Sequence, residues 1–160
     1  MRTSAGLLPY HHGRSGLEVF VGHMGGPFWA RKDEGAWSII KGLYDAEDED
    51  PLLAARREFA EETGATVAGG EISPLGELRA SGKLLTVYAV AADPSLAFVS
   101  SNTVTMEWPP RSGRILEFPE LDRAQWMPLD QARRLLVKGQ RPFLSRLEAA
   151  LPPPSSAADG

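Results

Sequence analysis

Residues 42–65 of this chain read GLYDAEDEDPLLAARREFAEETGA, and this stretch carries the clearest structural signal in the sequence. The Asp50-Pro51 pair is typical of a helix start, because Asp accepts hydrogen bonds from exposed backbone N–H groups and Pro is tolerated at the first helical position. Gly64 is a favoured terminator. The stretch therefore predicts a helix from Pro51 to about Thr63, preceded by an acidic, irregular segment.

Apolar and acidic side chains recur along this predicted helix at spacings of three and four residues. An apolar stripe for the core is formed by Leu52, Ala55 and Phe59. Glu58, Glu61 and Glu62 project together, away from that stripe. Crowded carboxylates repel each other unless a cation lies among them, and hard oxygen ligands suit Mg²⁺ or Mn²⁺. Arg57, four residues before Glu61, is placed to orient that carboxylate. For a Glu-Glu pair alone, a solvated acidic helix face is the alternative.

The whole stretch resembles the Nudix box. The pattern is Gly, five residues, Glu, seven residues, Arg-Glu, an apolar residue, any residue, Glu-Glu, any residue, Gly and an aliphatic residue. The residues that match in register are Glu49, Arg57, Glu58, Phe59, Glu61, Glu62 and Gly64. Six residues separate Gly42 from Glu49 instead of five, and Ala65 is a small closing residue. In the family the backbone carbonyl of the first glycine of the box is a metal ligand. The longer loop puts this role in question for Gly42.

The resemblance extends to roughly residues 3–150, over which the chain is similar to a bacterial subgroup of predicted pyrophosphohydrolases. It is carried there by the segments GGPFWARKDEGAWS at 25–38 and EWPPRSG at 107–113. Diadenosine tetraphosphate hydrolases are also similar, though less specifically. The resemblance implies an α/β/α sandwich around a mixed sheet. The length of the chain favours a single domain, over residues 1–151, and the Pro, Ser and Ala content of residues 152–160 predicts a frayed tail.

A water molecule that attacks phosphorus is the mechanism that the resemblance implies. Metal ions held by the Glu58, Glu61 and Glu62 carboxylates would activate this water. A carboxylate then acts as general base. The base lies either within the box or in a later loop, where Glu117 and Glu120 are the candidates. We prefer Glu120, because it stands six residues before Trp126, a spacing seen in diadenosine tetraphosphate hydrolases.

Cationic and aromatic side chains outside the box are candidates for substrate binding. Lys41 abuts the box, and Arg79 ends a predicted strand, so these two are the preferred phosphate contacts. Trp29 and Trp108 lie in predicted loops, where stacking on a nucleobase competes with a packing role. His23 forms no metal-ligand spacing and is interpreted as a strand or turn residue.

The remaining pattern interleaves strands and helices, which indicates a mixed α/β or α+β class. Strands are predicted at 6–10, 17–21, 37–40, 75–79, 84–91 and 124–127, with helices beginning at 128 and spanning 142–151. Residues 93–114 are interpreted as a long connection, because Trp108-Pro109-Pro110 does not fit inside a sheet.

Bulk properties limit the possible partners. The 160 residues contain no Cys, which excludes disulfides and thiolate chemistry. A net charge of −4 argues against a general nucleic-acid surface. Because no signal peptide or membrane span is recognisable, we expect a cytoplasmic protein, either a monomer or a homodimer.

These observations lead to one preferred function and two alternatives. The preferred function is Mg²⁺-dependent hydrolysis of a nucleoside diphosphate linked to another group. Dinucleoside polyphosphate is the first substrate choice, followed by an ordinary or oxidised nucleoside triphosphate and then ADP-ribose. The first alternative is a nucleotide-sensing domain without turnover, which the intact carboxylate set disfavours. The second, an isomerase of the same fold, is remote because no Cys is present as its acid–base partner.

Overall fold

The computed structural model describes residues 2–67, 69–80 and 82–151, and it contains the predicted helix as α1 (Pro51–Thr63). The Asp50 carboxylate accepts hydrogen bonds from the backbone N–H groups of Leu52 and Leu53 at 3.0 and 3.4 Å. Gly64 ends the helix with φ 72°, in the left-handed region that glycine adopts without strain. Both predicted helix ends are confirmed.

A seven-stranded mixed sheet forms the centre of the molecule, with the order β3-β2-β1-β6-β5. In addition, β4 pairs with β1 and β9 pairs with β2. The strands are β1 (Arg2–Gly13), β2 (Gly16–Met24), β3 (Trp37–Ser38), β4 (Ile40–Leu43), β5 (Ile72–Ala80), β6 (Lys83–Ala91) and β9 (Leu121–Pro128). The β1–β6 pair is parallel and the other pairs are antiparallel.

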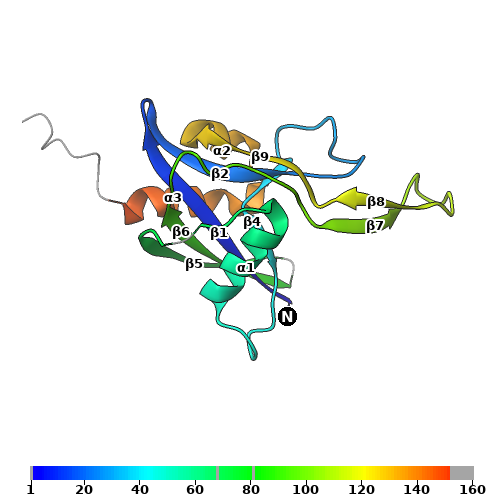
Figure 1. Cartoon of the computed structure of the whole chain (residues 1–160), viewed down its shortest axis with the longest axis horizontal. Helices are drawn as coiled ribbons and strands as arrows, with labels where there is room; N and C mark the ends of the chain where they lie inside the picture. Colours follow the sequence, from blue (N-terminus) through cyan, green and yellow to red (C-terminus); the bar gives the residue numbers. More distant parts are fainter. Residues whose placement is uncertain (1, 68, 81, 152–160) are drawn as a thin grey trace, which may run out of the picture.

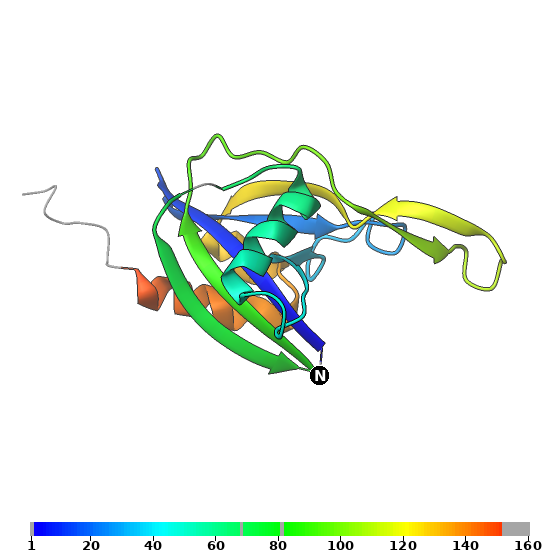
Figure 2. The same cartoon turned by 60° about the horizontal axis from the view of Figure 1, so that its bottom comes forward.

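Helices cover both faces of this sheet. Figures 1 and 2 show α1 on one face and both α2 (Leu129–Leu135) and α3 (Arg141–Ala150) on the other. A short 3-10 helix, η1 (Lys138–Gln140), precedes α3. The predicted α/β/α sandwich around a mixed sheet is therefore confirmed. In the part of the chain that the structure describes, no helix is long and apolar enough to span a membrane.

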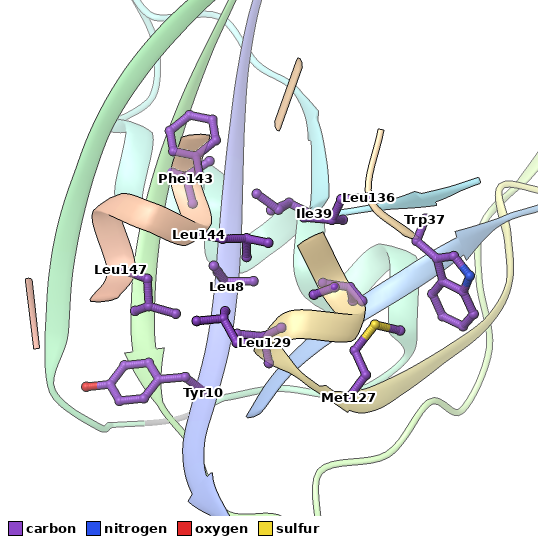
Figure 3. Close-up of a cluster of buried hydrophobic side chains, with 14 of the residues drawn as sticks. Leu8, Tyr10, Trp37, Ile39, Met127, Leu129, Leu136, Phe143, Leu144 and Leu147 are labelled. Atoms are coloured by element: carbon purple, nitrogen blue, oxygen red, sulfur yellow. The ribbon is translucent and has the colours of Figure 1, made fainter. Parts of the chain in front are cut away.

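Two apolar cores form because neighbouring residues of a strand point to opposite faces of the sheet. Leu8 packs in the core beneath α2 and α3, whereas its neighbour Leu7 packs in the core beneath α1. Figure 3 shows the first core, in which Leu144 and Leu147 of α3 lie over the sheet. Buried sheet residues therefore separate the two layers of helices.

The buried face of α1 differs from the predicted stripe. Ala54, Ala55 and Phe59 are buried, whereas Leu52 is only half-buried. Glu58 and Glu62 are buried as well, with 8% and 4% of their surfaces exposed. These carboxylates still line one cleft together with Glu61, and their burial comes from β4 and the segment before β9, which cover this side of the helix.

The predicted long connection at 93–114 is the clearest error in the prediction of secondary structure. It contains β7 (Thr103–Glu107), which pairs with β8 (Ile115–Pro119) in a two-stranded sheet. Figures 1 and 2 show this hairpin projecting from the body of the molecule. Trp108-Pro109-Pro110 lies in its turn, outside both strands, as the proline content predicts.

Candidate active site

An acidic cleft of about 450 Å³ lies where α1, β4 and the segment before β9 meet. It is lined by Arg2, Ser4, Lys41, Gly42, Leu43, Glu58, Glu61, Glu62, Lys83, Asn102 and Glu120. The structure therefore brings together the three helix carboxylates and the distant Glu120, as well as Lys41 and Gly42. Four carboxylates beside cationic side chains suit the binding of a cation and an anionic phosphate chain.

Gly42 allows the Glu58 carboxylate to lie against the backbone of β4. A Cβ atom at Gly42 would stand 1.8 Å from Oε2 of Glu58, a distance that no side chain tolerates. Burial raises the pKa of Glu58, and the nearby Arg57 guanidinium opposes this rise. The observed position of the Glu58 carboxylate therefore depends on glycine at residue 42, because a Cβ atom there would displace it.

Arg57 connects the acidic loop to the helix carboxylates. It donates two hydrogen bonds to Glu49, at 2.9 and 2.8 Å, in a bidentate pair. Its Nη1 also donates to Glu58 at 2.9 Å and to Glu61 at 3.2 Å. The hydrogen bond from Arg57 holds the pKa of Glu49 below its usual value. Arg57 thus orients two of the predicted metal-binding carboxylates.

The longer box loop is accommodated by a tight turn before the helix. The backbone N–H groups of Asp48 and Glu49 both donate to the carbonyl of Asp45 at 3.0 Å, and the Asp45 carboxylate accepts from Glu47 N–H at 2.9 Å. The turn absorbs the extra residue, so Glu49 still reaches Arg57 and Gly42 still lies against Glu58.

Glu62 is the most strongly perturbed carboxylate of the cleft. Its pKa is raised to about 9, first by burial, then by a hydrogen bond with Glu120 and by the negative charges of Glu120, Glu58 and Glu61. This crowding of carboxylates is what a divalent cation would relieve, and oxygen donors of this kind fit Mg²⁺. The carboxylates of the cleft therefore fit a divalent cation such as Mg²⁺.

Glu61 is more open, with its side chain 41% exposed. Among the residues that the structure describes, no three acidic, histidine or cysteine side chains converge in metal-ligand geometry. In the observed arrangement Nη1 of Arg57 bonds to carboxylate oxygens of both Glu58 and Glu61. For Glu58, Glu61 and Glu62 to coordinate a cation together, Glu58 and Glu61 must bind Arg57 and the cation at the same time.

Cationic side chains line the same cleft. Burial and the positive charge of Lys83 lower the pKa of Lys41, while Glu120, Glu62 and Glu58 oppose this shift. Arg2 lies beside Lys83 because β1 and β6 pair in parallel with these two residues in register. The sequence alone did not point to Arg2 or Asn102, and Lys83 was not among the preferred phosphate contacts. Only the pairing of strands and segments that are distant in sequence brings these residues to the helix.

Glu120 is held in the cleft by backbone contacts on both sides. Its N–H donates to the carbonyl of Asn102 at 2.8 Å, and its carbonyl accepts from Gly25 N–H at 2.8 Å. A Cβ atom at Gly25 would stand 2.1 Å from the Pro119 carbonyl oxygen, so this close approach requires glycine. The Gly25-Gly26 pair therefore positions the loop that carries Glu120.

Several further cavities share lining residues with the cleft, and two of them concern the substrate. The first, the chamber, has a volume of about 250 Å³, is lined by Trp29 and other apolar residues, and shares Lys41, Glu62 and Glu120 with the cleft. The second, the shelf, has a volume of about 580 Å³, lies beside Tyr44 and shares Arg2 and Leu43 with the cleft. The chamber and the shelf thus meet the cleft at different residues.

A family model for the NUDIX domain matches residues 14–147 of the chain. The chain belongs to the Nudix family. As a Nudix protein it is a hydrolase that acts on pyrophosphate bonds in nucleoside diphosphate derivatives. A search of curated protein sequences finds no significant match.

Solved Nudix structures share the fold at low sequence identity. The C. elegans Ap4A hydrolase binary complex is similar with a TM-score of 0.61 and 19% identity, over 93% of this chain and 96% of that one. The NUDIX domain of Shewanella oneidensis NrtR, complexed with ADP ribose, has a TM-score of 0.59 and 13% identity, over 92% and 86%. A mutT/nudix family protein from Listeria innocua has a TM-score of 0.58 and 18% identity, over 93% and 92%.

Two predicted substrate contacts of this Nudix protein do not reach the cleft or the chamber. Arg79 is exposed on β5, the edge strand of the sheet, and lines neither cavity. Trp108 is half-exposed in the turn of the β7–β8 hairpin, where its backbone N–H donates to the Arg114 carbonyl at 2.9 Å. Neither position was predictable without knowing the strand order and the hairpin.

Proposed function

We propose that this Nudix hydrolase is a Mg²⁺-dependent enzyme that cleaves a dinucleoside polyphosphate. The observation that carries the proposal is the cleft itself, in which four carboxylates and three cationic side chains line a space that adjoins both the chamber and the shelf. A substrate with a nucleoside at each end of a phosphate chain matches this arrangement. The Ap4A hydrolase activity of the similar C. elegans protein agrees with this choice.

Glu58, Glu61 and Glu62 are the residues that would hold the metal, with the carbonyl of Gly42 as a further oxygen ligand. A divalent cation bound there lowers the pKa of a coordinated water and offsets negative charge on phosphate oxygens. Arg57 holds the Glu58 and Glu61 carboxylates in place through its hydrogen bonds, so it acts as a positioning residue.

Glu120 is the proposed general base, because its backbone is held on both sides and its carboxylate lies among the acidic side chains of the cleft. It accepts a proton from the attacking water as the water oxygen bonds to phosphorus and the bond from phosphorus to the bridging oxygen breaks. The cationic side chains of Lys41, Arg2 and Lys83 bind phosphate oxygens. They hold the phosphate chain of the substrate so that its scissile bond is in line with the attacking water.

The test is product analysis on a substrate panel, with Mg²⁺ and with excess EDTA. The panel contains diadenosine tetraphosphate, ordinary and oxidised nucleoside triphosphates, and ADP-ribose. We expect Mg²⁺-dependent cleavage with diadenosine tetraphosphate as the best substrate. Preference for another member would reassign the substrate, and no cleavage together with measurable nucleotide binding would favour the sensing alternative.

Substitution of the cleft carboxylates by glutamine tests their role in catalysis independently of their role in stability. We expect Glu61→Gln and Glu62→Gln each to lower kcat by about 100-fold or more, because each removes a negatively charged oxygen ligand. The midpoint of thermal unfolding should change little for Glu61→Gln, whose side chain is 41% exposed. Wild-type rates in both variants would remove the proposed metal site.

A further inference from the structure

The chamber is enclosed by the body of the molecule on one side and by the hairpin on the other. Its apolar lining includes Met24, Trp29, Ile39, Val104, Met106 and Phe118. Its polar side chains are Ser38 and, where it opens into the cleft, Lys41, Glu62 and Glu120. A group that fills the chamber is therefore apolar and continuous with whatever occupies the cleft.

The roof of the chamber is one face of the β7–β8 hairpin. Val104 pairs with Phe118 and Met106 pairs with Leu116, so these four side chains lie on the same face of the two strands. Three of them, Val104, Met106 and Phe118, line the chamber. A two-stranded ribbon gains little stability by itself, so an apolar face directed at a cavity favours an apolar occupant.

One wall of the chamber is Trp29, which is held on several sides. Its backbone N–H donates to the carbonyl of Gly26 at 3.2 Å, and its backbone carbonyl accepts from the N–H of Lys32 at 2.9 Å. The Phe28 ring lies edge-on to it at 4.8 Å between centroids. Trp29 also packs against the core beneath α2 and α3. An indole packed in this way offers a planar surface on which an aromatic ligand can stack.

We propose that the chamber binds the nucleobase of one end of the substrate and that Phe118 and Met106 on the hairpin determine this recognition. The assignment of the phosphates to the cleft rests on the proposed function. Lys41 stands at the junction of chamber and cleft, where the first phosphate follows the nucleoside. The nucleoside at the opposite end meets the more open shelf beside Tyr44, so the two ends of the substrate are recognised differently.

The test measures binding by calorimetry with the full chain in the presence of Mg²⁺. Adenosine 5′-monophosphate is the first ligand, because it has no pyrophosphate bond and is not consumed by the proposed activity. Ribose 5-phosphate is the matched ligand that lacks the base. Wild-type protein should bind adenosine 5′-monophosphate at least about 10-fold more tightly than ribose 5-phosphate, since stacking contributes at this level.

Phe118→Ala should weaken binding of adenosine 5′-monophosphate by about 10-fold and leave ribose 5-phosphate binding unchanged. Ile115→Ala is the matched control, because Ile115 is 65% exposed on the same strand and does not line the chamber. Met106→Ala, at a partly exposed position of the lining, gives a second variant if Phe118→Ala unfolds. Circular dichroism checks the fold of each variant.

Three results would overturn the inference: equal binding of the two ligands by the wild type, unchanged nucleotide binding in Phe118→Ala and Met106→Ala, or an equal loss in Ile115→Ala. These results are independent of turnover. If the substrate panel shows no hydrolysis while the base-dependent binding persists, the proposed function fails and the chamber assignment stands.

Discussion

Gly42 illustrates how a missing side chain can determine the position of a functional one. The Glu58 carboxylate lies in the space that a Cβ atom at residue 42 would need, at 1.8 Å from Oε2. The sequence comparison with the Nudix box pointed to Gly42 through its carbonyl. The structure adds a steric reason for glycine that the motif does not state.

Gly42→Ala should therefore displace the Glu58 carboxylate and lower kcat by about 100-fold, because small misplacements of reacting groups are costly. Steady-state kinetics at saturating Mg²⁺ gives this value. Gly139→Ala is the matched control, since a Cβ atom there meets nothing within 4 Å. Equal activity in the two variants would show that the position of Glu58 does not limit the rate.

At the scale of elements, α1 is defined by local interactions at both of its ends. Asp50 caps the first turn, and Gly64 N–H bonds to the Ala60 carbonyl at 2.9 Å in the last. These interactions involve residues close in sequence, which is why the sequence alone predicted the helix within its observed bounds. The hairpin is the opposite case, because its strands are short and its apolar residues alternate over only a few positions.

Asp50→Ala should lower the free energy of unfolding by about 1 kcal/mol, since it removes the side-chain acceptor of the first helical turn. Urea unfolding followed by circular dichroism measures the change. Asp130→Ala serves as the control, because Asp130 caps no helix end and its side chain is 96% exposed. A larger loss in the control would contradict the capping role.

Across the whole molecule, the buried His23 connects β2 to the loop that follows it and to the distant β9. Its Nδ1 lies 2.9 Å from the Asp122 carboxylate on β9, and its Nε2 donates to the carbonyl of Lys32 at 2.7 Å. The ring also packs edge-on against Trp37 at 5.1 Å between centroids. This histidine therefore holds the loop that carries Trp29 against the sheet, as a structural residue.

His23→Ala should lower the free energy of unfolding by about 2–4 kcal/mol, because it leaves a cavity and unpaired polar atoms in the interior. The midpoint of urea unfolding checks this value, with the exposed His12→Ala as the control. A loss of less than about 0.5 kcal/mol for His23→Ala would show that Asp122 and Lys32 find other partners.

The sequence alone determined the helix, its ends and the grouping of Glu58, Glu61 and Glu62, because these depend on interactions within a few residues. It also placed Lys41 and Glu120 among the site candidates, through the motif and a spacing. The structure brings both to the cleft. The roles of these residues in metal binding and catalysis stay predictions.

Only the tertiary structure decided which other side chains share the cleft and the chamber. Arg2 and Lys83 meet through the parallel pairing of β1 with β6, whereas Arg79 is left on the edge strand. Phe118 reaches the chamber because a hairpin forms where the sequence indicated a connection. Contacts of this kind join residues that are far apart along the chain, and they depend on strand order and register, which local patterns do not encode.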